Sequence, residues 1–311
     1  MILGVVLGGQ APVLVAVTDE VPLWPVARAV ARTAERACVA LDLSRSGTAP
    51  VAAIRVGGRC PPALHPRVGS GVATIVRGGH GVTGRPLAPL DTEAVRRFAA
   101  TCGLTDFAVT ATGSPMLADH ELEVAAAIRA EVPDARITLS YEFGQPGLRE
   151  READTISNAA LCPEAGRIAD EVARELPGVP AYFARSGGGL VSAHYFRRYP
   201  QACYQGAEAC VRRGRAALAA DPARVVSDEL AAAYGATLGR PVAQVERIVQ
   251  ARGQVELDRE LQRARDEALT RVVSAGAAPG SAWIAETMVN PMSYLPDGLY
   301  RVRVKGEGVP P

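Results

Sequence analysis

The sequence predicts an α/β protein in which mostly parallel sheet layers are flanked by helices. Three segments near the middle of the 311-residue chain support this prediction, because they read as strand, helix and strand in succession. The β-rich run 137–140 comes first and the run 181–184 comes last. Between them, Ile168, Val172 and Leu176 recur at helical spacing. This succession builds parallel sheets, whose loops after the strands commonly bind ligands.

The N-terminal region is predicted to open with a β-hairpin. Apolar runs at 2–7 and 13–17 flank a glycine turn. The segment 22–41 has apolar residues one helical turn apart, which predicts an amphipathic helix, and 49–56 reads as a strand. The other predicted strands are 72–76, 107–110, 283–289 and 300–304, and the other predicted helices are 91–100 with Asp91 as its cap, 121–131, 203–219 and 262–275.

Composition and charge argue against several kinds of partner. Hydrophobic residues make up 48% of the chain and charged residues 22%, and the net charge of +1 gives no case for nucleic acid or an anionic membrane. Lys305 is the only lysine, which argues against Schiff-base chemistry. The six cysteines form no C-x-x-C pair, and glycine and proline break the apolar start. We therefore expect a cytoplasmic protein with reduced thiols and no membrane span.

A polar segment at 147–161, GLREREADTISNAAL, has an unusual density of charge beside small residues. One interpretation is a solvated helix face with internal ion pairs. The other is a loop-to-helix site that holds a polar ligand. The residues of the segment leave both interpretations open.

This segment, followed by a helix, a strand and the string SGGGLVS at 186–192, resembles the hydantoinase/oxoprolinase family. The family's strings have the form E-x-G-x-x-G-L-x-E-R-E-x-x-T-x-x-N-A and S-N-G-G-L-M-S. RGGH at 77–80, PMSYLP at 291–296 and RVRVK at 301–305 resemble it as well, and the segment 231–247 resembles the family's late helix, which is rich in alanine and glycine. Its members open cyclic amides and imides at the expense of ATP, on a fold similar to that of the actin and sugar-kinase ATPases. The resemblance implies a reduced form of that architecture, of the hydantoinase A subunit type.

The chain departs from the family where the family binds nucleotide. The N-terminal turn resembles G-x-D-x-G-G-T-x-T-D, but Val6 and Val13 replace its two aspartates and offer magnesium no oxygen ligand. Pro12 replaces a threonine and removes an amide donor. The second phosphate motif and most of the ATPase half are not visible after residue 200. The resemblance therefore implies a shortened form that uses no ATP, metal or other cofactor.

Residues near the predicted strand ends form the candidate site. A glycine turn presents His80 after a strand, so His80 is a candidate acid/base group, with structural packing as the alternative, and Glu142 is the second candidate. Arg149 would bind a carboxylate or an oxyanion, while other polar residues would orient the substrate. The predicted substrate contacts are Ser114, Arg149, Asn158, Ser186, Gly187 and Gly188.

Three segments and three functions are expected. Residues 1–60 form the region of the degenerate phosphate turn and pack with 201–311, a helical segment with a C-terminal α/β tail, while 61–200 form a central α/β domain that holds the site.

The first function is a hydrolase or related enzyme that opens or closes a ring, or shifts a proton, in a cyclic amide, imide or related carbonyl compound. The second is a non-catalytic subunit of a larger amidohydrolase-type complex, and the third is a small-molecule-binding protein. We expect a small-molecule substrate and either a homo-oligomer or a hetero-subunit.

Overall fold

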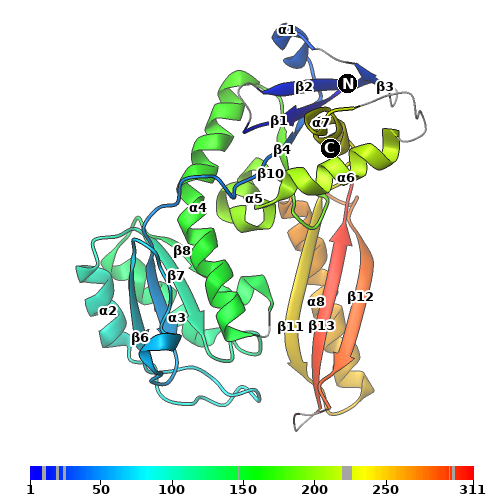
Figure 1. Ribbon diagram of the computed structural model, residues 1–311. Coiled ribbons are helices and arrows are strands. Elements are labelled where there is room, and N and C mark those ends of the chain that lie inside the picture. Colours follow the sequence, from blue (N-terminus) through cyan, green and yellow to red (C-terminus); the bar gives the residue numbers. More distant parts are fainter. Residues whose placement is uncertain are drawn as a thin grey trace.

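The computed structural model describes residues 1–8, 12–18, 21–23, 26–145, 147–218, 226–293, 295 and 298–311. Over these residues the chain forms three sheets, each with its own helices, and the long helix α4 (Leu148–Glu175) runs between two of them (Figure 1). We name the three bodies the six-stranded domain, the four-stranded domain and the C-terminal unit. The predicted α/β class, with helices flanking the sheets, is confirmed.

The six-stranded domain contains a mixed sheet with the strand order β10-β9-β4-β1-β2-β3. β4 runs parallel to β1 and to β9, and the other neighbours pair antiparallel. The predicted N-terminal hairpin is therefore present as β1 and β2. The strands are β1 (Ile2–Val6), β2 (Val13–Thr18), β3 (Val21–Leu23), β4 (Arg36–Ala40), β9 (Ala181–Ala184) and β10 (Leu190–Ser192).

Helices cover both faces of this sheet. The second half of α4 packs on one face, where Leu161 and Val172 share a core with Leu3. On the other face, α7 approaches β1 so closely that a Cβ atom at Gly4 would collide with the backbone oxygen of Ala233. The helices of the domain besides α4 are α1 (Arg28–Ala31), α5 (Ala193–Arg198), η3 (Pro200–Cys203), α6 (Gly206–Leu218) and α7 (Asp228–Thr237).

The helix predicted over residues 22–41 is wrong for most of that segment. The chain there forms β3, the short helix α1 and then β4, which lies inside the sheet. Residues 37–40 are all buried, because helices cover both faces of β4. An apolar run of this kind lacks the alternation of a half-exposed strand, so its period does not distinguish it from a buried helix.

The four-stranded domain contains an all-parallel sheet with the order β6-β5-β7-β8. α2 and α3 cover one face, where Val95 and Ile128 share a core with Ile54. The first half of α4 covers the other face, where Ile156 shares a core with Ala53. The elements besides α4 are β5 (Ala52–Val56), η1 (Pro62–Leu64), β6 (Val72–Val76), α2 (Thr92–Thr101), β7 (Asp106–Ala111), α3 (Asp119–Glu131), β8 (Arg136–Leu139) and η2 (Ser140–Phe143).

The polar segment 147–161 forms the first half of α4. It is helical, but Arg151, Glu152 and Asn158 are buried rather than solvated. Glu152 forms a buried ion pair with Arg55 of β5, and this pair ties the helix to the sheet. The small residues of the segment allow α4 to lie close to the strands, while its buried polar groups find partners inside the domain.

The C-terminal unit is a three-stranded antiparallel sheet with the order β11-β13-β12, covered by one helix. Leu261 and Ala268 of that helix share a core with Val302. The unit contacts the four-stranded domain, since the Ile248 backbone N–H donates to the Pro115 oxygen at 3.1 Å. Its elements are β11 (Val242–Gln250), α8 (Gln254–Ser274), β12 (Trp283–Pro291) and β13 (Leu299–Glu307). The helix expected over 231–247 is therefore wrong at its end, where the chain forms β11.

Sheet membership does not follow the predicted boundaries at residues 60 and 200. β5 lies before residue 60 but belongs to the four-stranded sheet, and β9 and β10 lie before residue 200 but belong to the six-stranded sheet. The four-stranded sheet thus crosses the boundary at residue 60, and the six-stranded sheet takes strands from two separate parts of the chain, on either side of the four-stranded sheet.

Candidate functional site

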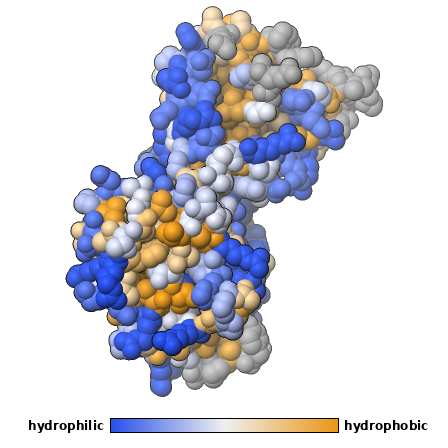
Figure 2. All heavy atoms as spheres, turned by 60° about the vertical axis from the view of Figure 1, so that its left-hand side comes forward, coloured by the Kyte–Doolittle hydropathy of each residue, from blue (hydrophilic) through white to orange (hydrophobic). Residues whose placement is uncertain are grey.

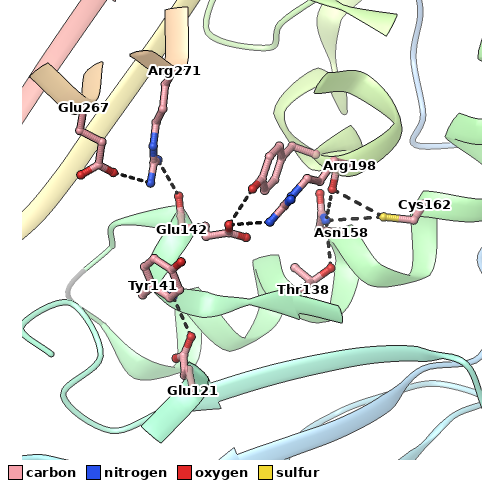
Figure 3. Close-up of polar contacts among 10 residues, drawn as sticks. Glu121, Thr138, Tyr141, Glu142, Asn158, Cys162, Arg198, Glu267 and Arg271 are labelled. Atoms are coloured by element: carbon pink, nitrogen blue, oxygen red, sulfur yellow. Dashed lines mark hydrogen bonds and ion pairs between the residues drawn. The ribbon is translucent and has the colours of Figure 1, made fainter. Parts of the chain in front are cut away.

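The best candidate site is a cavity of about 190 Å³ lined by side chains from all three bodies. This volume is below the range of about 300–1,000 Å³ found for pockets that hold drug-sized ligands, so the cavity has room only for a smaller molecule. We call it the Glu142 cavity, and Figure 3 shows part of its wall. Its lining residues are Glu142 of η2, then His194, Tyr195, Arg198 and Tyr199 at α5, and Arg271 and Ser274 of α8.

Glu142 lies in η2, directly after the carboxyl end of β8, and its side chain is 9% exposed. Its Oε1 accepts a hydrogen bond from the Tyr199 hydroxyl at 2.7 Å and another from Arg198 Nη2 at 3.1 Å (Figure 3). Its Oε2 is buried and has no hydrogen-bond partner within the described part of the chain. Leaving a buried acceptor unsatisfied is costly, so a donor from a ligand or from water in the cavity would stabilise it.

The groups around Glu142 are donors. Burial, followed by the neighbouring Glu142 carboxylate, raises the pKa of Tyr199 above its ordinary value of 10.0, so its hydroxyl keeps its proton. Arg271 Nη1 donates to the Glu142 backbone oxygen at 3.5 Å, and its guanidinium also pairs with Glu267 at 2.7 Å (Figure 3). The cavity therefore combines one carboxylate oxygen that has no partner among the described residues with two guanidinium groups and two phenols.

Asn158, a predicted substrate contact, forms hydrogen bonds behind the wall of the cavity. It is fully buried on α4, and it is not among the lining residues. Its Nδ2 donates to the Arg198 oxygen at 2.9 Å and to Thr138 Oγ1 at 3.2 Å, and its Oδ1 accepts from the Gln201 N–H at 3.2 Å. These bonds join β8 to the end of α5, which places Tyr199 beside Glu142.

A second buried network fixes η2 from the side of the sheet. Glu121 accepts from Ser140 Oγ at 2.5 Å and from the Tyr141 N–H at 3.1 Å. Arg151 donates to Ser114 Oγ at 3.2 Å. Ser114 is 3% exposed, so the predicted substrate contact takes part in this internal network. Because Glu121 and Arg151 are both almost fully buried, the network holds the backbone on either side of Glu142 rigidly.

His80 lies apart from the Glu142 cavity. It follows β6 at the carboxyl edge of the parallel sheet, is 3% exposed, and donates its backbone N–H to the Thr112 oxygen at 2.8 Å. Its ring lies against that of His120, with 4.1 Å between the centroids, and its Nδ1 has no hydrogen-bond partner among the described residues. Burial and the His120 ring lower the pKa of His80, which favours the neutral imidazole. His80 does not line the cavity.

The remaining predicted contacts are also elsewhere. Arg149 is exposed in the first turn of α4. Ser186, Gly187 and Gly188 form the turn between β9 and β10, where Ser186 Oγ accepts from the Gln205 N–H at 2.9 Å. The structure thus places one of the eight predicted site residues, Glu142, in this cavity, and a role in catalysis or binding stays a prediction for all eight.

Sequence reasoning missed the partners of Glu142. A usable signal was present in HYFRRY at 194–199, where a histidine, two arginines and two tyrosines lie together after a predicted strand. Arg271 and Ser274 had no such signal, because they lie on an ordinary amphipathic helix far along the chain. Glu121 and Arg151 also read as helix-surface residues, although both are buried.

The cysteines offer no obvious nucleophile. Burial raises the pKa of Cys203 to about 12 and that of Cys210 to about 11, so neither is a thiolate at neutral pH.

Within the described ranges, no group of three or more His, Cys, Asp or Glu residues could hold a metal ion. None of the helices described is both long and apolar enough to cross a membrane.

The fold is similar to that of two enzymes of known structure. No model of a known protein family matches the sequence, and no curated protein does. The ATP-dependent caprolactamase from Pseudomonas jessenii gives a TM-score of 0.68 at 10% identity, over 99% of this chain and 87% of that chain. Nucleotide-free acetone carboxylase, an enzyme of ATP-dependent acetone carboxylation, gives 0.52 at 12% identity, over 68% of this chain and 39% of that chain. At these identities the likeness shows that the chain shares their fold, and it assigns no reaction to the chain.

Proposed function

We propose that this chain is a shortened hydantoinase/oxoprolinase-type enzyme that acts, without ATP, on a small cyclic amide, imide or related carbonyl compound. The observation that supports this most directly is the buried, unpartnered Oε2 of Glu142 in a small cavity with two guanidinium groups. The resemblance of the polar segment to this family and the similarity of the fold to an ATP-dependent caprolactamase support the substrate class.

The cavity fits an amide that presents its N–H and its carbonyl oxygen to different groups. The ring N–H, or a water molecule, donates to Glu142 Oε2, and the carbonyl oxygen accepts from Arg198 or Arg271. In ring opening, Oε2 takes a proton from water as the water oxygen attacks the carbonyl carbon. The guanidinium stabilises the oxyanion, and the proton passes to the ring nitrogen as the C–N bond breaks. Ring closure is the reverse.

Independence from ATP is proposed from the residues around the N-terminal turn. Val6 and Val13 on β1 and β2 provide no ligand for a metal–nucleotide complex. Gln10 and the residues on either side of it lie outside the described residues. A large depression next to this turn has Asp42, Glu164 and Glu171 among its lining residues, and these carboxylates repel a triphosphate.

The test is conversion of small lactams, cyclic imides and hydantoins by the purified protein, with and without magnesium-ATP, followed by mass spectrometry. We expect conversion without ATP, and a loss of about 100-fold or more in Glu142→Gln, because the general base is removed while the shape is kept. Glu93→Gln, at a side chain that is 70% exposed on α2, is the matched control. Conversion that requires ATP, or that survives in Glu142→Gln, contradicts the proposal. Binding without conversion supports a small-molecule-binding protein instead.

A further inference from the structure

The large depression next to the N-terminal turn is a long groove, lined mostly by apolar residues, on the six-stranded domain. It lies away from the Glu142 cavity. Its volume is about 890 Å³, and it shares no lining residue with the Glu142 cavity. Leu7 and Leu14 belong to its floor on the β1–β2 side, and Ile168 and Val172 of α4 form a wall. The space-filling view shows apolar side chains gathered on the upper lobe with hydrophilic side chains along one flank (Figure 2).

The shape of the groove follows the helix that borders it. The lining residues of α4 begin at Glu164, recur every three or four positions and end at Leu176. This spacing is one face of a helix, and at 1.5 Å per residue it extends for about 18 Å. A groove of this length accommodates about three turns of a second helix laid against α4, with its apolar side chains at i, i+3, i+4 and i+7.

The charge of the rim favours a basic occupant. Glu164, Arg167, Glu171 and Glu175 follow one another along α4, and Asp42 follows the end of β4, so the lining has four carboxylates and one guanidinium. A second guanidinium lies beside this rim, because Arg32 Nε donates to the Glu175 backbone oxygen at 3.3 Å. Arg167 already donates to Glu164 at 2.8 Å and to Glu171 at 2.9 Å. The negative charge is distributed along the whole groove rather than gathered at one end. A partner with several cations along its length matches this better than a ligand with one charged head.

A second copy of this chain does not supply such a helix from its described residues. Among the described residues, the exposed large apolar side chains on its α-helices are Val30, Leu122, Val255 and Val273, and the short helix η1 adds only Leu64. Leu122 is the only one on α3, and Val255 and Val273 lie at opposite ends of α8, so they form no apolar stripe at helical spacing.

We infer that this groove is a docking site for an amphipathic, basic helix of a different protein. The apolar face of that helix would pack on Leu14 and Ile168, and its lysines or arginines would lie against the carboxylates of α4. The inference is independent of the reaction proposed for the Glu142 cavity, because the two sites are lined by different residues.

The test uses a fluorescein-labelled synthetic peptide of about 14 residues, with leucines at i, i+3, i+4 and i+7 and lysines at the flanking positions. A second peptide has glutamate at each lysine, and a third has the same composition with the helical pattern scrambled. Fluorescence anisotropy measures binding to the full chain. We expect the basic amphipathic peptide to bind at least about tenfold more tightly than either control, and added salt to weaken its binding.

Leu14→Asp should weaken binding of the basic peptide by about tenfold or more, because it places a charge in the apolar floor. Val255→Asp, at a side chain that is 83% exposed on α8, is the matched control and should leave binding unchanged. Glu171→Lys keeps the apolar floor and should reduce both the affinity and its salt dependence, so it tests the rim without disturbing the core. Equal binding of all three peptides, no binding of the basic peptide, or no effect of Leu14→Asp overturns the inference. Sedimentation that shows self-association abolished by Leu14→Asp overturns it in favour of a second copy.

Discussion

Glu142 and His80 are both buried, but they differ in the donors and acceptors around them. Glu142 has two donors on Oε1 and a cavity beside it, whereas His80 lies against the His120 ring and finds no partner for Nδ1 in the part of the chain that the structure describes. A carboxylate with one satisfied and one unsatisfied oxygen is oriented and can still accept a proton or a hydrogen bond. The two residues predicted as an acid/base pair therefore lie in separate places in this structure, and a catalytic role stays a prediction for both.

The histidine gives a pH prediction. Burial and His120 lower the pKa of His80 below its ordinary value of 6.5 in the folded state, so the unfolded chain binds this proton more tightly. The contribution of His80 to stability is therefore complete above the ordinary value and falls as the pH drops through it towards the lower, folded-state pKa. We expect His80→Phe to retain more of its stability than the parent chain when the pH is lowered from about 7.5 to about 5.5.

Denaturant unfolding at both pH values measures this difference, and His65→Gln, at an exposed histidine, is the control. Identical losses of stability in the parent chain and in His80→Phe would show that His80 is not protonated on unfolding in this range.

At the scale of elements, the closest packing is between α7 and β1. Gly4 is the residue that permits it, because any side chain there would collide with the Ala233 carbonyl. The neighbouring residues Leu3 and Val5 point to the opposite face, where α4 covers them. β1 is thus held between two helices, and its position on the α7 side depends on the absence of one methyl group.

Gly4→Ala should destabilise the chain by about 1–3 kcal/mol or more, because overpacking forces α7 away from the sheet. Thermal or denaturant unfolding measures the loss. Gly47→Ala is the control, since a Cβ atom there would meet nothing within 4 Å. Equal losses of stability in Gly4→Ala and Gly47→Ala would contradict the close packing of α7 on β1.

The elements also show what the sequence could and could not predict. The strands β6 and β9 and the hairpin β1–β2 were predicted because glycine, proline or polar residues bound short apolar runs. The strand β4 was read as a helix because helices bury both of its faces, so its pattern has no alternation. The polar half of α4 could not be placed from its composition, since Arg151 and Glu152 are buried only through partners elsewhere in the fold.

At the scale of the whole molecule, the Glu142 cavity exists because three bodies meet. Glu142 was a candidate from its place after a strand, but Tyr199 is 57 residues away in sequence and Arg271 is 129 residues away. Contacts over such separations depend on how the domains dock, which local patterns do not encode.

Gly144 lies where the four-stranded domain meets the C-terminal unit. Its φ is 71°, and a Cβ atom there would come within 2.5 Å of the Glu246 Cβ.

Gly144→Ala should loosen the contact between η2 and β11, because it combines an unfavourable left-handed conformation with a collision, at a cost of about 1–3 kcal/mol. Hydrogen exchange should become faster in η2 and in the adjoining part of β11, with little change in α3. Gly253→Ala is the control. Gly253 lies in the C-terminal unit, to which β11 belongs, and a Cβ atom there would meet nothing within 4 Å. Unchanged exchange at η2 in Gly144→Ala would contradict this account of the junction.

The helix α4 contributes Ile156 and Ala159 to the core of one domain, and Leu161 and Val172 to the core of the other. One continuous helix thus contributes to both cores, with no loop between its two halves. One cut in the chain cannot release either domain intact. A cut at either end of α4 leaves one of the two cores without the residues that α4 contributes to it. Any exchange of one of these domains for another would therefore have to divide α4 or replace half of it.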